Sequence, residues 1–376
     1  MQSESVRPTN QEHTKSGERF DNIDLLRALA IMSVVLFHFT ARFPADLTLY
    51  RHALPSFDYG NLGVELFFII SGYCIWMTIS RSHGLIDFLA KRFGRIQPAF
   101  TAAVLLTFAV VTLFGLPGRQ VSIAAMLGNL SWLTCFYNIH LVDGAYWSLI
   151  TELKFYVLFG TIFFALKKWV KPFDAWLTLS IAGAVLFLFS RLFLQSSTGE
   201  MIATQILLFP YAPFFLVGMA ICDSASLGVY RKIACAAALA LAAFQGGFDP
   251  IAAAILIALV PLTALVLARR SMRIPVWLRF IGLISYPLYL IHQNIGLVIL
   301  RQMASVIESD ALRCATTMVI LVLLASLISI LFEHRYRPLF ESLIREPWRF
   351  LSRCLSTLRR SGRSPTQAVC LDQLRD

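Results

Sequence analysis

The feature that most constrains this chain is a series of apolar stretches, each long enough to cross a bilayer as one helix. Ten such runs of roughly 16–22 residues alternate with more polar connections. They cover residues 24–42, 61–80, 99–116, 147–167, 173–194, 203–222, 230–245, 249–268, 280–301 and 313–333. Backbone polar groups in hydrocarbon must be satisfied within the segment itself, so such runs form helices. We therefore expect an all-α, polytopic membrane protein with about ten transmembrane helices.

The composition agrees with this class of fold. The chain has 376 residues, of which 57% are hydrophobic and only 15% are charged. Soluble domains carry about 25% charged residues, so this composition argues against a chain made of several soluble domains. Seven cysteines occur without the spacing of a disulfide framework or a zinc site, and no HExxH motif is present. The sequence therefore predicts core cysteines and no metal site.

The positive charges of the chain are distributed unevenly across the predicted spans. If the N-terminus is cytoplasmic, only six of the 33 Lys and Arg residues fall in external segments, and Lys154 lies within the fourth span. The six are Arg42, Arg51, Arg119, Arg191, Arg301 and Arg313. By the positive-inside rule this asymmetry predicts that both termini are cytoplasmic. It also accounts for the net charge of +11, so the expected partner is the lipid bilayer and not nucleic acid.

The same pattern divides the chain into three parts. Residues 1–20 are expected to be a cytoplasmic N-terminal segment, 21–342 the transmembrane domain and 343–376 a basic cytoplasmic tail. The tail is rich in arginine, and part of it is expected to form a helix against anionic lipid. The oligomeric state is left open by the sequence.

Two ionisable residues on the first apolar run require an explanation. Arg27 and His38 are eleven residues apart, which on an α-helix places them on the same face and about 16 Å apart along the axis. Each also has a simpler interpretation, because Arg27 could anchor the helix at the interface and His38 could be a neutral, hydrogen-bonded core residue. Together they predict a polar path along one face of the helix, because ionisable groups in hydrocarbon tend to be functional.

Further polar residues recur in the later spans. Glu65 and Glu152 lie near the predicted outer ends of the second and fourth spans, where each could pair with His38. Arg92 and Arg95 lie in KRFGRIQP, which is expected to be a cytoplasmic turn with Pro98 starting the third span. Two arginines three residues apart on one helical face are suited to phosphate groups, although simple anchoring fits them equally well.

The ninth run carries a polar stripe. Ser285, Tyr289 and His292 are spaced by four and three residues, so they share a helical face. Pro287 in the same run removes a backbone N–H and is expected to kink the helix. His292 also fits a purely structural hydrogen-bonding role.

Five motifs occur in one order along the chain. They are D-x-x-R followed by His (residues 24–38), G-V-x-x-F-F-x-x-S-G (63–72), R-x-x-R-I-x-P (92–98), W-S-L-x-x-E-x-x-F-Y (147–156) and G-x-x-S-Y-x-L-Y-L-x-H (282–292). In this combination the chain resembles the acyltransferase 3 family of integral membrane acyltransferases over about residues 20–340. The resemblance implies an enzyme of the bacterial inner membrane, with ten core helices. It implies transfer of an acyl group, most often acetyl, from cytoplasmic acyl-CoA to a hydroxyl of a glycan or lipid-linked saccharide.

With that resemblance the polar residues take specific roles. Arg27, Arg92 and Arg95 are expected to bind the phosphates of acetyl-CoA, which acts as a co-substrate; no permanently bound cofactor is expected. His38 is expected to be the general base, oriented by Glu152 or Glu65. Candidates for stabilising the oxyanion or contacting the acceptor are Trp147, Ser285, Tyr289 and His292.

Two other classes of function compete with this hypothesis. A transporter or exporter of a polar or acylated metabolite also places Arg, His and Glu inside the membrane, but without acyl-transfer chemistry. A structural partner in a polysaccharide assembly would tolerate replacement of His38. The five motifs together favour the acyltransferase.

Overall fold

The computed structural model describes residues 15–43, 55–194, 197–245, 247–269, 272–333 and 335–361. Every regular element in these ranges is helical. The α-helices are α1 (Lys15–Phe37), α3 (Gly63–Ile79), α4 (Leu85–Phe114), α5 (Ile123–Leu130), α6 (Trp147–Leu166), α7 (Pro172–Phe189), α8 (Ser197–Met201), α9 (Ala212–Cys222), α10 (Val229–Gln245), α11 (Pro250–Ala268), α12 (Val276–Leu283), α13 (Ser285–Ile291), α14 (Asn294–Met303), α15 (Asp310–Ile328) and α16 (Arg337–Ser361).

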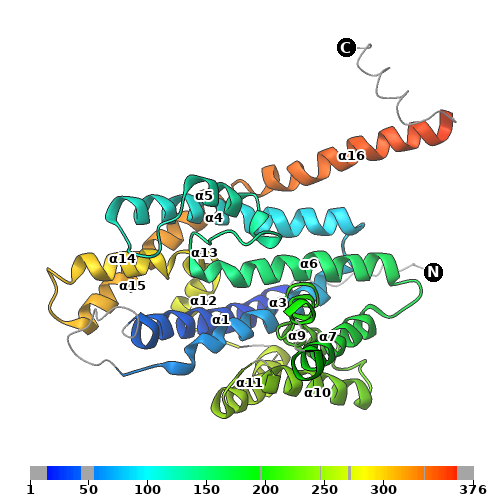
Figure 1. Ribbon diagram of the computed structural model, residues 1–376, viewed down its shortest axis with the longest axis horizontal. Coiled ribbons are helices and arrows are strands. Elements are labelled where there is room, and N and C mark those ends of the chain that lie inside the picture. Colours follow the sequence, from blue (N-terminus) through cyan, green and yellow to red (C-terminus); the bar gives the residue numbers. More distant parts are fainter. Residues whose placement is uncertain are drawn as a thin grey trace, which may run out of the picture.

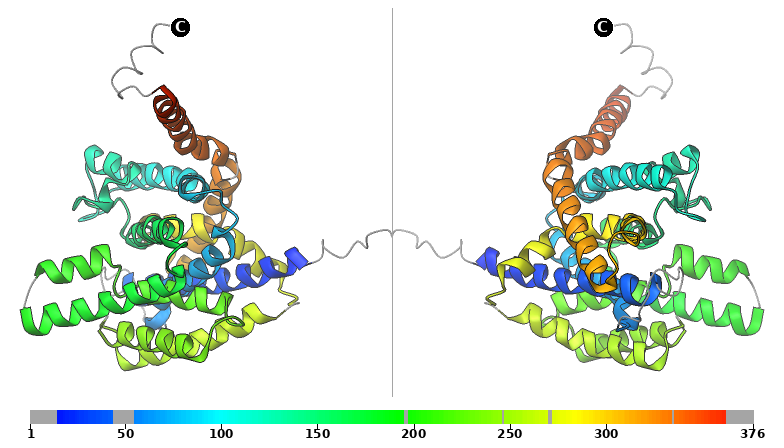
Figure 2. Two further views of the ribbon diagram at one scale, coloured as in Figure 1. Left: turned by 90° about the vertical axis from the view of Figure 1, so that its right-hand side faces the viewer. Right: turned by 90° about the vertical axis from the view of Figure 1, so that its left-hand side faces the viewer.

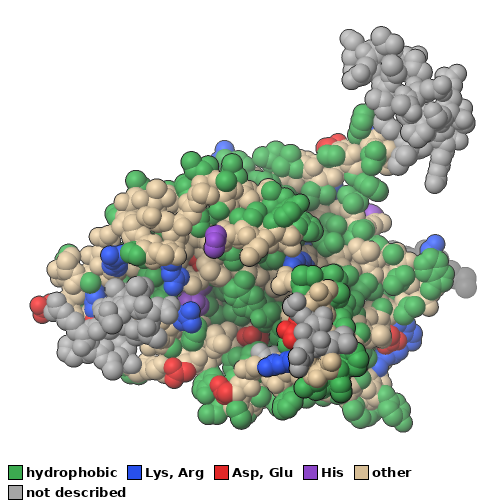
Figure 3. Space-filling view, viewed as in Figure 1, with side chains coloured by type: hydrophobic (Ala, Val, Ile, Leu, Met, Phe, Trp, Pro, Cys, Tyr) green, Lys and Arg blue, Asp and Glu red, His purple; other side chains and the backbone are tan. Residues whose placement is uncertain are grey.

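Seven helices of the described part of the chain are long and apolar enough to cross a membrane. They are Asp21–Arg42, Asp58–Ile79, Leu85–Phe114, Gly144–Leu166, Pro172–Phe193, Pro250–Ala268 and Asp310–Glu333. Each overlaps one of the ten predicted runs. Hydrophobic side chains also cover much of the face seen in Figure 3. The prediction of an all-helical, multi-pass membrane protein is therefore confirmed, whereas the number ten and the orientation stay predictions.

The other three predicted runs are not single long helices. Run 203–222 is divided between a π-helical turn and the short helix α9, and run 230–245 is the 17-residue α10. Run 280–301 is broken into α12, α13 and α14. The first of these breaks has a local cause, because the ring of Pro287 would clash with the carbonyl of Leu283, the last residue of α12. The single span, kinked at Pro287, that was expected over 280–301 is thus three short helices.

The third span also differs from expectation. KRFGRIQP is not a turn, because α4 begins at Leu85 and continues to Phe114, with Pro98 inside it and not at its start. Thirty residues of α-helix are about 45 Å long, whereas the hydrocarbon core is about 30 Å thick. The helix is therefore about half as long again as that core, and its basic N-terminal half carries Arg92 and Arg95.

Two close helix contacts position the elements around the site. At Gly72, in α3, an added Cβ would lie 2.0 Å from the carbonyl oxygen of Phe215 in α9. At Gly282, in α12, it would lie 2.1 Å from the carbonyl oxygen of Asp24 in α1. Glycine permits these backbones to touch, as is common between membrane helices. Figure 1 shows the result: α1, α3 and α6 run side by side, with α9, α10 and α11 along one edge.

The C-terminal helix begins before the predicted tail. α16 starts at Arg337, packs against α4 and then projects away from the bundle (Figure 2). Ion pairs hold it there, because Arg345 lies 3.1 Å from Asp87 of α4 and 3.0 Å from Glu341 within α16. Part of the predicted tail is therefore a docked helix, while residues 362–376 and residues 1–14 of the N-terminal segment lie outside the described ranges.

Candidate active site

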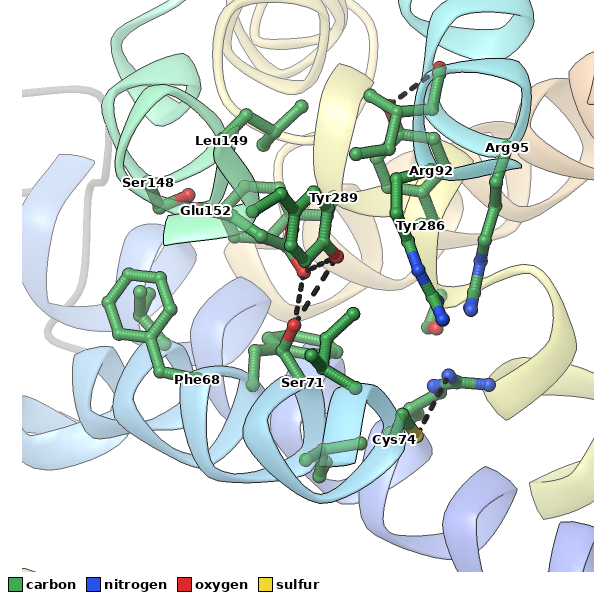
Figure 4. A pocket seen from close by; sticks show the side chains of 18 of the residues that line it. Phe68, Ser71, Cys74, Arg92, Arg95, Ser148, Leu149, Glu152, Tyr286 and Tyr289 are labelled. Carbon is green, nitrogen blue, oxygen red and sulfur yellow. Dashed lines mark hydrogen bonds between the residues drawn. The ribbon is translucent and has the colours of Figure 1, made fainter. Parts of the chain in front are cut away.

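A narrow pocket of about 110 Å³ lies near the middle of the bundle, where α1, α3, α4, α6, α12 and α13 meet (Figure 4). We call it the central pocket. Its polar and charged lining residues are Arg27, Ser71, Arg92, Arg95, Ser148, Glu152, Tyr156, Ser285, Tyr286, Tyr289 and Glu333. Six of the ten site residues predicted from the sequence are among them. The folded chain thus gathers residues from both ends of the sequence around one cavity.

A second hollow of about 630 Å³ adjoins the central pocket. We call it the basic hollow, because its lining adds Arg81, Lys91 and Arg337. Arg27, Arg92 and Arg95 line both cavities, so they lie where the two meet. A wide cationic entrance therefore leads into a narrow, less charged pocket.

The three arginines at this junction are held in different ways. Arg27 lies 3.5 Å from the carboxylate of Asp24, one turn earlier in α1, and donates to the sulfur of Cys74 at 4.0 Å. Arg92 donates to the hydroxyl of Thr78, with its guanidinium 5.4 Å from the ring centre of Phe88. Arg95 makes no hydrogen bond with another described residue. Figure 4 shows Arg92 and Arg95 extended in the same direction, as their spacing predicts.

Glu152 lies deeper in the central pocket. Its carboxylate accepts a hydrogen bond of 2.6 Å from Ser71 and one of 2.5 Å from Tyr156 (Figure 4). No hydrogen bond joins Glu152 to His38 in the described structure, although the sequence suggested that partnership. The difference arises because Glu152 and Tyr156 are one turn apart on α6, and this face of α6 is directed at Ser71 on α3.

His38 instead pairs with a second imidazole. The π-helical turn His38–Arg42 continues α1, and Nε2 of His292 lies 3.3 Å from Nδ1 of His38. The two ring centres are 4.7 Å apart, with the planes inclined at 78°. His292 is fully buried and His38 is half-buried. We call these residues the histidine pair.

Backbone carbonyls determine the tautomers of the histidine pair. Nδ1 of His38 lies 2.9 Å from the carbonyl oxygen of Val34, and Nδ1 of His292 lies 2.7 Å from that of Tyr289. A carbonyl only accepts, so each Nδ1 must carry the hydrogen. Nε2 of neutral His292 is then an acceptor directed at His38. In neutral His38, the lone pair belongs to Nε2, which is the arrangement required of a general base.

Tyr289 separates the central pocket from the histidine pair. Its side chain lines the pocket, its hydroxyl lies 2.7 Å from that of Ser148, and its backbone carbonyl accepts from His292. Its ring centre is 5.4 Å from that of His292. The imidazoles thus lie directly beyond the pocket wall, at the opposite end of the span Asp21–Arg42 from Arg27.

The break between α13 and α14 is anchored by a residue that the sequence reasoning missed. Asp143 is fully buried and accepts from the backbone N–H groups of Ala145 at 2.9 Å and Asn294 at 2.8 Å. Burial raises the pKa of Asp143 to about 6, opposed by these two hydrogen bonds and by the charge of Arg119. Asp143 therefore ties the start of α6 to the segment that follows His292.

Like the histidine pair, two more of the predicted residues, Glu65 and Trp147, lie outside both cavities. Glu65 is 5% exposed in the first turn of α3, and its Oε2 has no hydrogen-bond partner among the described residues. Trp147 is 37% exposed at the start of α6, with its ring centre 5.0 Å from Tyr211 and 6.2 Å from Phe68. The structure therefore groups neither of them with the arginines.

Some of the missed residues had a detectable signal. Tyr156 follows Glu152 by four residues, which is the spacing of facing residues on a helix. Asp143 directly precedes a helix start, where a carboxylate caps the first N–H groups. The pairing of His38 with His292 had no such signal, because the two are 254 residues apart in the chain.

Comparison with known proteins shows which family and which relatives this part of the chain is similar to. The family model described as an acyltransferase domain matches residues 20–334. The chain is 27% identical over 169 residues to the peptidoglycan O-acetyltransferase OatA of Listeria monocytogenes, covering 40% of this chain and 25% of the relative. It is 27% identical over 180 residues to the O-acetyltransferase OatA of Staphylococcus aureus, covering 43% and 28%.

A third relative comes from a different context. The exopolysaccharide production protein ExoZ of Rhizobium meliloti is 29% identical over 196 residues, covering 47% of this chain and 60% of the relative. This chain therefore spans about a quarter of the two OatA proteins and about three fifths of ExoZ. No solved structure matches the chain with comparable significance.

Proposed function

Because the chain belongs to the acyltransferase family whose domain covers residues 20–334, we propose that it is a membrane O-acyltransferase. It moves an acyl group, acetyl by default, from cytoplasmic acyl-CoA to a hydroxyl of a glycan or a lipid-linked saccharide. The names of the relatives support this class of reaction and of acceptor. Both termini of the chain are cytoplasmic, and the protein resides in the bacterial inner membrane.

The observation that carries the proposal is the arrangement of charge along one path. Arg27, Arg92 and Arg95 stand where the wide basic hollow narrows into the central pocket, and the histidine pair lies beyond the far wall. Acyl-CoA has the same asymmetry, with a phosphorylated nucleotide at one end and a thin pantetheine arm at the other. The hollow accommodates the nucleotide and the guanidiniums bind its phosphates. The arm then extends through the pocket past Glu152 and Ser71.

His38 performs the proton transfer in this proposal. Nε2 of His38 removes the proton from the acceptor hydroxyl as the hydroxyl oxygen attacks the thioester carbonyl carbon. The carbon–sulfur bond then breaks, the acyl group stays on the acceptor oxygen, and the coenzyme A thiolate leaves. The proton on the imidazolium is returned to the thiolate, which restores neutral His38. Each bond formed is matched by a bond broken, so no further reactant is required.

The neighbours of His38 support this role. His292 accepts from the Nδ1–H of His38 and so stabilises the imidazolium that forms during the reaction. Tyr289 lies between the pocket and the imidazoles. Its hydroxyl donates to the carbonyl oxygen of Ala145 at 3.1 Å and lies 2.7 Å from that of Ser148; turned away from this carbonyl, it is the candidate donor to the oxyanion. The exposed ring of Trp147 is available to an acceptor sugar, and Ser285 serves as a pocket wall residue. Glu152 takes part in donor binding instead of orienting the base.

The proposal is tested with the full chain purified in lipid nanodiscs. The protein is supplied with acetyl-CoA and a bacterial membrane extract, and two quantities are followed: release of coenzyme A thiol and the mass of the extracted saccharides. The expected result is thiol release together with a saccharide heavier by one acetyl group, both absent from the His38→Ala protein. Uptake of a metabolite into proteoliposomes without thiol release would indicate the transporter class instead.

A further inference from the structure

A cavity larger than the central pocket and the basic hollow lies on the other side of α3 from the central pocket. It is a groove of about 1040 Å³ bordered by α3, α9, α10 and α11. Apart from Ser224, Lys232 and Arg269, its wall consists of aliphatic side chains, two cysteines and one tyrosine. We call it the α9–α11 groove. Neither the residues nor the chemistry of the proposed acyl transfer involves it.

Small side chains are the reason for the groove. Where α10 and α11 line it, several positions carry alanine, including Ala236, Ala240 and Ala264. Their short side chains leave the space between the helices unfilled. An empty apolar volume of this size forfeits the dispersion contacts that close packing supplies. In a bilayer, a hydrocarbon chain fills such a space without loss of hydrogen bonds.

Two cations lie together at one end of the groove. Lys232 is in the first turn of α10 and Arg269 caps the end of α11. The groove is lined by the N-terminal half of α10 and the C-terminal half of α11, so both cations belong to the same end of it. Among the described residues neither side chain is joined to a carboxylate. The next residue, Arg231, differs in this respect, because it forms two hydrogen bonds of 2.7 Å with Asp174.

This cationic end faces the same side of the membrane as the basic hollow. The side-chain amide of Asn22 donates to the backbone carbonyl of Arg269 at 2.7 Å, which fixes that end beside the start of α1. Ile23 and Arg27, in the same part of α1, line the basic hollow. His38 lies at the opposite end of the helix. A phosphate bound by Lys232 and Arg269 therefore belongs to the leaflet of the basic hollow.

We propose that the α9–α11 groove binds an anionic phospholipid of the cytoplasmic leaflet, with its phosphate at Lys232 and Arg269 and an acyl chain along the alanine-rich wall. A phospholipid fits this leaflet better than a lipid-linked acceptor does. The phosphate of an acceptor must lie near His38 for its saccharide to reach the imidazole, whereas Lys232 and Arg269 lie at the opposite end. The two cations argue for an anionic headgroup over a zwitterionic one. The choice of a phospholipid over a lipid-linked acceptor rests on the proposed role of His38, whereas lipid labelling of the groove is measured without any acyl transfer.

The test uses the full chain in phosphatidylcholine nanodiscs with a trace of phosphatidylglycerol that carries a photoactivatable diazirine on one acyl chain. After irradiation, the labelled peptides are mapped by mass spectrometry. We expect adducts on the groove faces of α10 and α11, about tenfold more than with a phosphatidylcholine diazirine probe. Equal labelling by the two probes would mean ordinary boundary lipid and would overturn the proposal.

Variants distinguish binding of the lipid headgroup from binding of the lipid acyl chain. The double variant Lys232→Gln/Arg269→Gln is expected to reduce phosphatidylglycerol labelling to the phosphatidylcholine level. Its matched control, Lys168→Gln/Lys171→Gln, removes the same charge from exposed positions outside the groove and is expected to leave labelling unchanged. Ala240→Phe fills the wall without altering charge and is expected to reduce labelling by both probes.

Competition tests the identity of the occupant. Unlabelled phosphatidylglycerol is expected to displace the probe more effectively than an unlabelled polyprenyl phosphate. The opposite order would assign the groove to an isoprenoid carrier, and crosslinks to a second copy of the chain would assign it to a dimer interface. Either result would overturn the phospholipid proposal. Gel-filtration profiles of all variants establish that they are folded.

Discussion

The two ends of the span Asp21–Arg42, formed by α1 and the π-helical turn after it, contrast sharply in charge. Near its start, Arg27 is joined by Arg92 and Arg95 around a cavity that is also lined by Arg81 and Lys91. At its end, His38 meets the fully buried His292, and the described hydrogen bonds of both imidazoles involve backbone carbonyls and each other. One end is suited to a polyanion, and the other holds two buried or half-buried imidazoles with defined tautomers. If the proposed function is correct, binding and chemistry belong to different ends of one span, and mutations can separate them.

The largest effect is expected at the base. His38→Ala should lower kcat by roughly 10²–10⁴-fold, the range typical of a lost general base, because no other group then removes the acceptor proton. Binding of acyl-CoA, measured by calorimetry on the same nanodiscs, should stay within about twofold of the parent because the arginines are intact. Equal loss of acyl-CoA binding and of turnover would contradict the assignment of binding and chemistry to different ends of the span.

The next largest effect is expected at the cationic end. Arg92→Gln/Arg95→Gln should raise KM for acyl-CoA by about 10²-fold, since each charge-assisted hydrogen bond is worth a factor of roughly ten or more. The value of kcat at saturation should be retained. Lys168→Gln/Lys171→Gln removes two exposed charges elsewhere and serves as the control. A reduced kcat with an unchanged KM would place these arginines in the chemical step.

A smaller effect is expected from the second imidazole. His292→Phe keeps the ring volume but removes one of the two acceptors for Nδ1–H of His38 and leaves the carbonyl of Val34, so kcat should fall about tenfold, the cost of one hydrogen bond in a buried site. The pH dependence distinguishes a positioning role from a structural one. Without His292 the imidazolium of His38 is less stabilised, so the acidic limb of the kcat profile should move to lower pH. An unchanged limb would contradict the role of His292.

The smallest effect tests to which end Glu152 belongs. Glu152→Gln keeps an acceptor for Ser71 and Tyr156, so KM for acyl-CoA should rise only about threefold to tenfold, as expected for loss of charge from one hydrogen-bonded group. The pH profile of kcat should match that of the parent protein. A shifted profile would show that Glu152 acts on His38 after all and would restore the partnership suggested by the sequence.

Much of the site followed from local spacing. Arg92 and Arg95 are three residues apart on α4, and Arg27 is eleven residues before His38 on one helix, so their faces were predictable. The partner of His38 was not, because a contact between residues 254 apart depends on how α1 and α13 pack. That packing rests on the backbone contact at Gly282 and on the break after His292, which Asp143 anchors.

Pro98 shows why helix boundaries were harder to place than helix identity. Proline is common in the first turn of a helix, and the apolar run begins at residue 99, so the sequence favoured a start there. The helix instead begins at Leu85, because its basic half packs against α16, where Gly94 allows the close approach of Glu341. Tertiary contact overrode a local preference that is worth only a few kcal/mol.

The sequence by itself determined the all-helical membrane architecture and the residues that carry charge, because apolar run length and motif spacing are properties of contiguous segments. The tertiary structure decided which of these residues meet: His38 with His292, Glu152 with Ser71, and the three arginines at the mouth of one pocket. The physical reason is that a helix presents side chains in every direction, and only the crossing of neighbouring helices selects the direction that becomes a site.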